Sequence, residues 1–188
     1  MRNALRIDDL VVPVPDDGSQ LRLSVRVRPG EITAVQATPA AGTALARTVA
    51  GLAAPLSGRV YVADRDVTDQ PPAARQIGYI PAGGGLLPHL TVRDNIEYGL
   101  RRREVVRELS RDWAATVTHR LELVPTLELR PHQLSDAQRL RVALARAAVC
   151  LPEALVVDTP DPEITLPDLV ARATLPATPQ MAVLVITP

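Results

Sequence analysis

The stretch that decides the fold reads His132-Gln133-Leu134-Ser135-Asp136-Ala137-Gln138-Arg139-Leu140-Arg141-Val142-Ala143-Leu144-Ala145-Arg146-Ala147, and Pro152-Glu153-Ala154-Leu155-Val156-Val157-Asp158 follows shortly after it. Ser135 can cap a helix, with Gln138 placed to reach back to it as in a capping box, so we expect a helix over residues 135–149. The continuous apolar run at residues 154–157 suits a strand covered on both faces, as in a parallel sheet flanked by helices. Together the two segments predict an α/β protein.

The rest of the chain extends this pattern in both directions. Residues 21–27 alternate apolar with polar side chains, which is typical of a half-buried strand, and residues 182–186 form a second continuous apolar run. The expected strands are residues 5–12, 21–27, 32–35, 58–63, 77–80, 154–157 and 182–186, and the expected helices are residues 43–52, 90–99, 104–121, 135–149 and 166–173. This order predicts a single domain over residues 1–188, with a core (1–85 and 149–188) interrupted by a helical lobe (86–148).

Composition excludes several classes of protein. No apolar run is long enough to span a bilayer, and the N-terminal segment reaches Asp8-Asp9 too soon to form the apolar region of a signal peptide, so a cytoplasmic location is expected. One cysteine, Cys150, excludes an intrachain disulfide and a cysteine-cluster metal site. The formal net charge is zero, and the one basic run, Arg101-Arg102-Arg103, precedes acidic residues. We therefore expect a solvated helix face there and no nucleic-acid partner.

Several segments resemble the ATP-binding-cassette ATPases in order and spacing, over roughly residues 5–187. The resemblance is closest to ATPase subunits of bacterial solute importers. The segments that carry it are residues 45–52, 58–62, 66–68, 75–80, 87–96 and the two quoted above. The resemblance implies a P-loop NTPase-like (RecA-like) core with an antiparallel β portion and an inserted helical lobe. It also implies ATP and Mg²⁺ as ligands, a membrane permease as partner, and a homodimer or heterodimer with another such domain.

The phosphate loop of this family reads G-x-x-x-x-G-K-[ST], in which backbone amides cradle the phosphates, the lysine reaches the outer two and the hydroxyl holds Mg²⁺. Aligned without gaps, the chain has Gln36-Ala37-Thr38-Pro39-Ala40-Ala41-Gly42-Thr43, followed by Ala44. Gly42 takes the place of the lysine, and only Thr43 keeps its role. A shift of one residue would align Gly42 with the second glycine and put Thr43 in the place of the lysine.

Neither alignment supplies a cation, because the chain contains no lysine. It has 21 arginines instead. Pro39 also removes one amide donor from the expected cradle. A charge-assisted hydrogen bond contributes about 1.5–3 kcal/mol, so the missing lysine alone should weaken ATP binding about tenfold or more.

The signature loop of the family, L-S-G-G-Q, presents its serine and a helix N-terminus to ATP held by the opposite subunit. In this chain Ser135 and Gln138 remain, and Asp136 and Ala137 replace the two glycines. Asp136 would place a negative charge beside a phosphate. Two like charges 4 Å apart at an effective dielectric of 20 repel each other by about 4 kcal/mol. The helix dipole stabilises a phosphate by only about 1–2 kcal/mol. We therefore expect repulsion, although Asp136 is also an ordinary first-turn helix residue.

The remaining chemical positions of the family are altered too. Asp158 stands where the resemblance puts the magnesium-supporting aspartate, and it could equally be a structural carboxylate at a strand end. Thr159 replaces the glutamate that polarises water, and a hydroxyl is too weak a base for that task. Ala82 replaces the glutamine that senses the γ-phosphate in the family. Val14 stands in place of the aromatic residue that stacks on adenine, and Pro188 stands in place of the switch histidine. The glycines at 83–85 predict a flexible connector.

Three hypotheses follow from this pattern. The first is a degenerate subunit without ATP turnover, a pseudo-ATPase with a binding or regulatory role, docked on a membrane transporter through residues 82–90 at the inner face of the membrane. Its vestigial sites would be the phosphate loop at 36–44, the signature residues Ser135 and Gln138, and the metal positions Thr43 and Asp158, with no catalytic residue; ATP and Mg²⁺ are expected only if the altered site still binds them. The second is a weak ATPase that uses Thr43, Asp158 and Arg47. The third is a decayed product without a present function.

Overall fold

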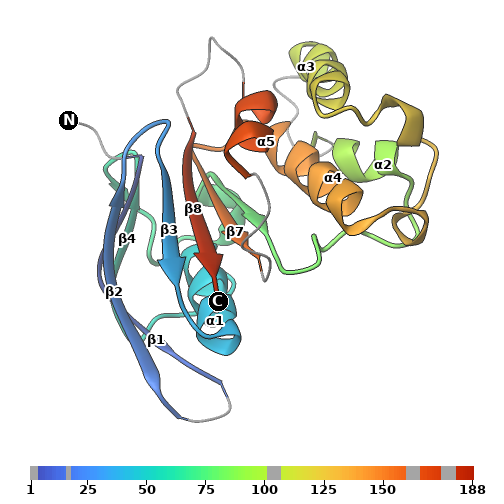
Figure 1. Cartoon of the computed structure of the whole chain (residues 1–188). Helices are drawn as coiled ribbons and strands as arrows, with labels where there is room; N and C mark the ends of the chain where they lie inside the picture. The colour runs from blue at the N-terminus through green and yellow to red at the C-terminus, as the bar shows by residue number, and fades with distance from the viewer. Residues whose placement is uncertain (1–3, 16–17, 101–106, 160–165, 175–180) are drawn as a thin grey trace. The chain divides into compact units, whose positions relative to one another are not determined.

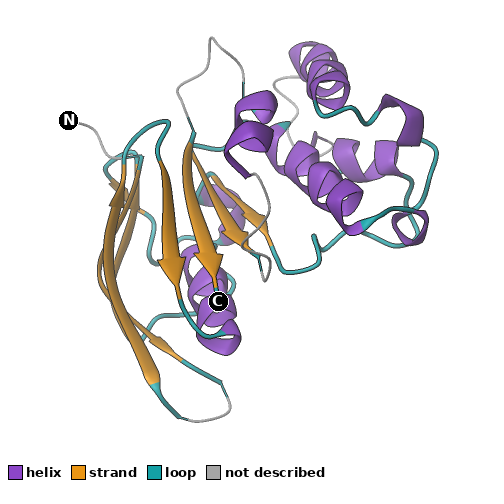
Figure 2. Cartoon of the chain, in the orientation of Figure 1, coloured by secondary structure: helices purple, strands orange, loops and turns teal. Residues whose placement is uncertain are grey.

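The computed structural model of the protein describes residues 4–15, 18–100, 107–159, 166–174 and 181–188 (Figures 1 and 2). Arg101-Arg102-Arg103 and the start of the helix expected at 104–121 lie outside these ranges. The described chain divides into two compact units. The first draws on Met1–Ala82, Pro152–Ile164 and Ala177–Pro188, and the second on Gly83–Leu151 and Thr165–Pro176. Among the described residues, no helix combines the length and apolar character needed to span a membrane.

The first unit contains an antiparallel sheet in the order β2-β1-β4-β5. Its strands are β1 (Leu5–Pro13), β2 (Gln20–Val27), β4 (Ser57–Val62) and β5 (Arg65–Asp66). Side chains of β2 alternate between exposed and partly buried, as the alternating sequence predicts. β1 buries Leu5, Ile7 and Leu10 completely and so provides one wall of the core.

The first unit also contains a parallel sheet in the order β3-β8-β7-β6. Its strands are β3 (Ile32–Gln36), β6 (Ile77–Ile80), β7 (Ala154–Asp158) and β8 (Ala182–Thr187). All of β7 is buried, and so is β8 except for Thr187, which confirms the prediction made from the two apolar runs. Because the strands are parallel, the ends of β3, β7 and β8 lie along one edge of this sheet.

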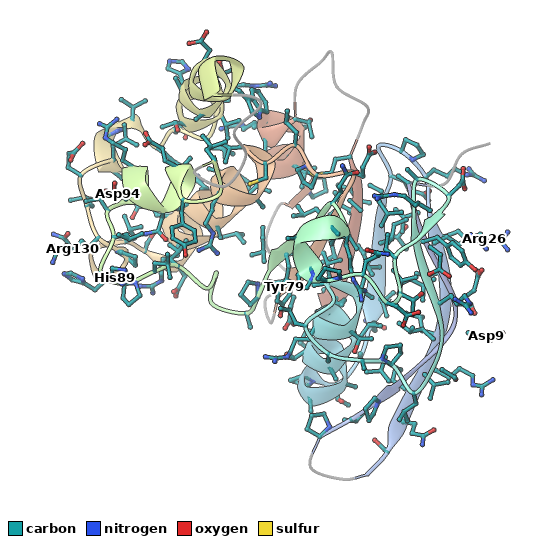
Figure 3. All side chains as sticks on the ribbon, turned by 180° about the vertical axis from the view of Figure 1, so that it is seen from behind. Asp9, Arg26, Tyr79, His89, Asp94 and Arg130 are labelled. Carbon is teal, nitrogen blue, oxygen red and sulfur yellow. The ribbon has the colours of Figure 1, made fainter. Side chains whose placement is uncertain are left out.

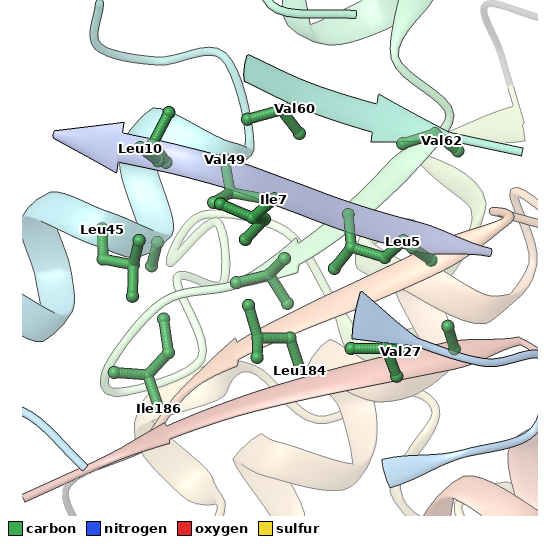
Figure 4. Close-up of a cluster of buried hydrophobic side chains, with 14 of the residues drawn as sticks. Leu5, Ile7, Leu10, Val27, Leu45, Val49, Val60, Val62, Leu184 and Ile186 are labelled. Carbon is green, nitrogen blue, oxygen red and sulfur yellow. The ribbon is translucent and has the colours of Figure 1, made fainter. Parts of the chain in front are cut away.

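Helix α1 (Pro39–Val49) packs on both sheets of the first unit. Its buried Leu45 and Val49 belong to one apolar core with Ile7 of β1 and with Leu184 and Ile186 of β8 (Figure 4). This core fixes the position of the helix relative to the strand ends, and therefore the geometry of the site described below.

The start of α1 differs from the sequence-based expectation. We expected a loop at 38–42 and a helix over 43–52, but the helix begins at Pro39. The fixed φ of proline suits the first helical position, and the Thr38 side chain caps the helix by accepting a hydrogen bond from the Ala41 amide at 3.4 Å. Reading the proline as part of a loop was the error.

Arg75 secures the other end of α1. Only 3 % of the residue is exposed, and its guanidinium donates to backbone carbonyls alone: Nε to Gln70 (2.8 Å), Nη1 to Thr48 (3.1 Å) and Val49 (3.0 Å), and Nη2 to Thr68 (2.6 Å). Burial lowers the pKa of Arg75 from its ordinary value. The carbonyls of Thr48 and Val49 belong to the last turn of α1, so Arg75 acts as a cap supplied from outside the helix.

The second unit is helical. It consists of α2 (Val92–Glu97), α3 (Arg107–Arg120), α4 (Asp136–Ala148) and α5 (Leu166–Ala173), with short 3-10 turns between α3 and α4. The expected capping box of α4 is present: Ser135 Oγ accepts from the Gln138 amide (3.2 Å), and Gln138 Oε1 accepts from the Ser135 amide (2.9 Å). We had assigned α5 to the core segment 149–188, but it groups with the helical unit, where Arg120 donates to the carbonyls of Ala171 and Thr174 at its end.

Asn95 of α2 organises the loop that precedes its helix. The side chain is fully buried; its Oδ1 accepts from the Leu87 amide (2.8 Å), and its Nδ2 donates to the carbonyls of Leu87 (3.1 Å), Leu90 (3.3 Å) and Thr91 (3.0 Å). One amide side chain thus contacts four backbone groups, with the two Nδ2 hydrogens shared among three carbonyls, and holds the conformation of residues 87–91.

Candidate functional site

The segment expected to form the phosphate loop is short and largely helical. β3 ends at Gln36 and α1 begins at Pro39, so only Ala37 and Thr38 connect them. The Gly42 amide donates to the Thr38 carbonyl at 2.8 Å, as in an ordinary helix, and the Ala41 amide is taken by the Thr38 cap. Pro39 has no amide hydrogen. Two of the amides that the resemblance assigns to a phosphate cradle, those of Ala41 and Gly42, therefore serve the helix, and the Ala37 amide donates to the Thr187 carbonyl of β8 (2.9 Å).

Gly42 is buried where the resemblance puts a lysine. A Cβ atom built on Gly42 would lie 2.8 Å from Cγ2 of Ile186 in β8, closer than carbon atoms approach without a shift. The space that the first side-chain atom of a lysine would need is therefore filled by a core residue.

Thr43 and Asp158 meet as the gapless alignment predicts. Thr43 Oγ1 donates to Asp158 Oδ2 at 2.7 Å, and Asp158, at the end of β7, is 9 % exposed. Their contact favours this alignment over the one shifted by a residue. However, no group of three or more His, Cys, Asp or Glu side chains in the described part of the chain could hold a metal ion. A Mg²⁺ ion here would depend on water and phosphate oxygens for most of its ligands.

Tyr79 of β6, labelled in Figure 3, lies within electrostatic reach of Asp158, and our sequence analysis did not single it out. Burial raises the pKa of Tyr79, the negative charge of Asp158 raises it further, and the positive charge of Arg47 opposes both effects. Tyr79 pairs with Val156 in the strand that ends at Asp158. This register is seen only in the structure, so no local sequence pattern pointed to Tyr79.

The raised pKa of Tyr79 predicts a loss of stability in alkali. The unfolded chain releases this proton near pH 10, whereas the folded protein still holds it, so the effect is absent below about pH 10 and grows as the pH rises through the folded pKa, by at most about 1.4 kcal/mol per unit. Above about pH 10 the melting temperature of the wild type should fall more steeply with pH than that of Tyr79→Phe. Equal slopes in thermal melts would contradict the assignment.

The other altered positions provide no catalytic base. Thr159 is 4 % exposed, and its amide donates to the Ile186 carbonyl at 3.0 Å. Val14 is buried and its amide donates to the Ser19 carbonyl (2.9 Å), and Pro188 directly follows β8. None of these side chains can take a proton from water at neutral pH.

In the helical unit, Ser135 and Gln138 are brought together at the start of α4, where both take part in the capping box. The side chain of Asp136 is 97 % exposed and forms an ion pair with Arg139, whose Nη1 also donates to the Pro131 carbonyl (3.3 Å). Our estimate of the repulsion counted the charge of Asp136 alone, and Arg139 offsets part of that charge. Repulsion of a phosphate at this position is therefore weaker than our charge-pair estimate.

The connector at Gly83–Gly85 is more ordered than the sequence suggests. All three glycines have positive φ, and Arg146 of α4 donates to the carbonyls of Gly84 (3.0 Å) and Gly85 (2.9 Å). A Cβ on Gly84 would lie 3.4 Å from the Cβ of Ala143. The segment we expected to be a flexible connector is held against α4.

Comparison with known proteins settles the family. A family model described as "ABC transporter" matches residues 21–161. The chain belongs to this family. It is 38 % identical over 139 residues to the spermidine/putrescine import ATP-binding protein PotA of Acidothermus cellulolyticus, a match that covers 73 % of this chain and 36 % of that protein. It is 37 % identical over 139 residues to the molybdate/tungstate import ATP-binding protein WtpC of Pyrococcus horikoshii, a match that covers 73 % of this chain and 40 % of that protein.

A solved structure supports the ABC fold. The chain superposes on cbiO1 from Clostridium perfringens, part of the ABC transporter complex cbiONQ, with a TM-score of 0.73 and 17 % identity, covering 100 % of this chain and 79 % of that one. The expected fold class, a P-loop core with an antiparallel β portion and an inserted helical lobe, is thereby confirmed. The chain matches well under half the length of the ABC relatives PotA and WtpC.

The residues of this ABC protein do not fit the triphosphate of Mg-ATP as the family motif binds it. Thr43 and Asp158 are suitably placed for the metal side. On the phosphate side the lysine is absent, the amides of Ala41 and Gly42 are engaged within the chain, and Gly42 lies against Ile186. The cradle therefore lacks the lysine charge and the amide hydrogen of residue 39, and the amides of Ala41 and Gly42 are already engaged.

Proposed function

We propose that this chain is the cassette portion of a solute-importer ATP-binding subunit that no longer turns over ATP and serves in binding or regulation. The observation that carries the proposal is the packing of Gly42 against Ile186 in a chain without lysine. Phosphoryl transfer depends on positive groups around the transferring phosphate and on an oriented water, and neither the cation nor a base at position 159 is available.

The proposed partner is the membrane permease of an importer, reached from the cytoplasmic face. Relatives of this chain carry import ATP-binding names for different solutes, so the solute class is left open. The proposed docking surface in the helical unit is the loop at 87–91 that Asn95 fixes. We also propose a homodimer or heterodimer with a second ABC domain. We propose no nucleic-acid partner.

The test is phosphate release from Mg-ATP by the purified protein, with calorimetric titration of Mg-ATP alongside it. We expect no turnover above that of Asp158→Ala, which serves as the control for contaminating ATPases. Turnover of about one per second or faster that Asp158→Ala abolishes would overturn the proposal.

A weak ATPase is the second candidate, because one observation favours it. Arg47 is exposed one turn after Thr43, and its charge acts on Tyr79 close to Asp158. An arginine there could bind a phosphate. If the protein releases phosphate from Mg-ATP, and Arg47→Ala weakens Mg-ATP binding tenfold or more (about 1.4 kcal/mol), this candidate replaces the first.

A further inference from the structure

We infer that Ile186 closes the lysine position to any side chain, so that this site cannot regain a phosphate-binding cation through substitution of Gly42 alone. The inference deepens the proposed loss of turnover by assigning a second residue to it. Ile186 acts sterically, through its Cγ2 atom, at the position that the family motif gives to lysine.

The first support is the placement of a glycine inside a helix. Gly42 is buried in α1 and makes the regular hydrogen bond to Thr38, and it is not among the residues with positive φ, so its backbone does not require glycine. Glycine is among the least favoured residues in a helix interior. The close approach of Ile186 Cγ2, 2.8 Å from where a Cβ would lie, explains why glycine stands there.

The second support is that α1 has little room to move aside. Thr43, the next residue, is bonded to Asp158, and Asp158 pairs directly with Ile186 in the register of β7 and β8. Gly42 thus contacts β8 and Thr43 is hydrogen-bonded to β7, so two neighbouring strands limit the movement of α1. Ile186 is itself 2 % exposed, within the core that contains Leu45 and Val49, so it cannot rotate into solvent.

The test is a comparison of Gly42→Ala in three backgrounds. In the wild type, the added methyl should lower the melting temperature by about 3–10 °C. In Ile186→Ala, which lacks Cγ2, the same substitution should raise the melting temperature, because alanine favours the helix and fills the vacated space. Ile186→Val is the matched control: it keeps Cγ2, so Gly42→Ala should remain destabilising there. A shift of the same sign and size in all three backgrounds would overturn the inference.

A binding measurement separates the effect on Mg-ATP affinity from the effect on stability. Gly42→Lys in the wild-type background should lower the melting temperature and leave the affinity for Mg-ATP within about threefold of the wild type. A gain of tenfold or more from this single substitution would overturn the inference. ATP turnover by the wild type would defeat the proposed function but would not affect either comparison, so the two failures are distinguishable.

Discussion

Arg75→Met is expected to lower the free energy of unfolding by about 3–5 kcal/mol, which corresponds to a fall of about 10 °C in melting temperature. Methionine can fill much of the volume of the side chain but donates no hydrogen bond. The substitution would leave the carbonyls of Gln70, Thr48, Val49 and Thr68 without this donor, in a region where water has little access. Thermal melts followed by circular dichroism measure the effect.

Arg59→Met is the matched control for Arg75. Arg59 lies in the same unit, but its side chain is 58 % exposed, and its recorded ion pair is with Asp66 on the surface. We expect its removal to leave the melting temperature almost unchanged. If the two variants melted together, Arg75 would not be the cap of α1 that its contacts indicate.

Asn95→Leu should have the second largest effect, a loss of about 2–4 kcal/mol in the helical unit, since leucine has a similar size but satisfies none of the backbone groups at 87–91. Trp113 is the one tryptophan of the chain and is buried in α3 of the same unit, so its fluorescence reports the unfolding of that unit. The exposed His89 in the same loop provides the control, His89→Ala.

Hydrogen exchange at the Leu87 amide should accelerate strongly in Asn95→Leu and stay slow in His89→Ala, because Asn95 Oδ1 is the acceptor of that amide. Unchanged exchange at Leu87 would show that the loop keeps its conformation without Asn95. The assignment of this loop as a fixed docking surface would then lose its structural support.

The fold was predictable where the sequence shows a periodic pattern of apolar side chains, a continuous apolar run or a helix-capping motif. The apolar runs in β7 and β8 predicted their parallel pairing, and the Ser135–Gln138 spacing predicted the cap of α4. The gapless phosphate-loop alignment also predicted that Thr43 and Asp158 belong together, and they share a hydrogen bond. Each of these signals is local or follows from an alignment to a family motif.

Contacts between distant segments could not be predicted from local patterns. Arg75 resembles any surface arginine in the sequence, and only the fold shows that it is buried under carbonyls. The role of Gly42 depends on one methyl group of Ile186, which no motif encodes. The early start of α1 was readable from Thr38-Pro39, but the family motif favoured a loop at that place.

The glycine triplet at 83–85 has a consequence for how this chain tolerates change. Three left-handed residues in succession suit achiral glycine and disfavour every L-amino acid, and the carbonyls that Arg146 engages keep that conformation in place. Alanine is abundant elsewhere in the chain, yet at Gly84 it would face both backbone strain and the Cβ of Ala143. Handedness of the backbone thus restricts substitution along this short stretch, most of all at the buried Gly84.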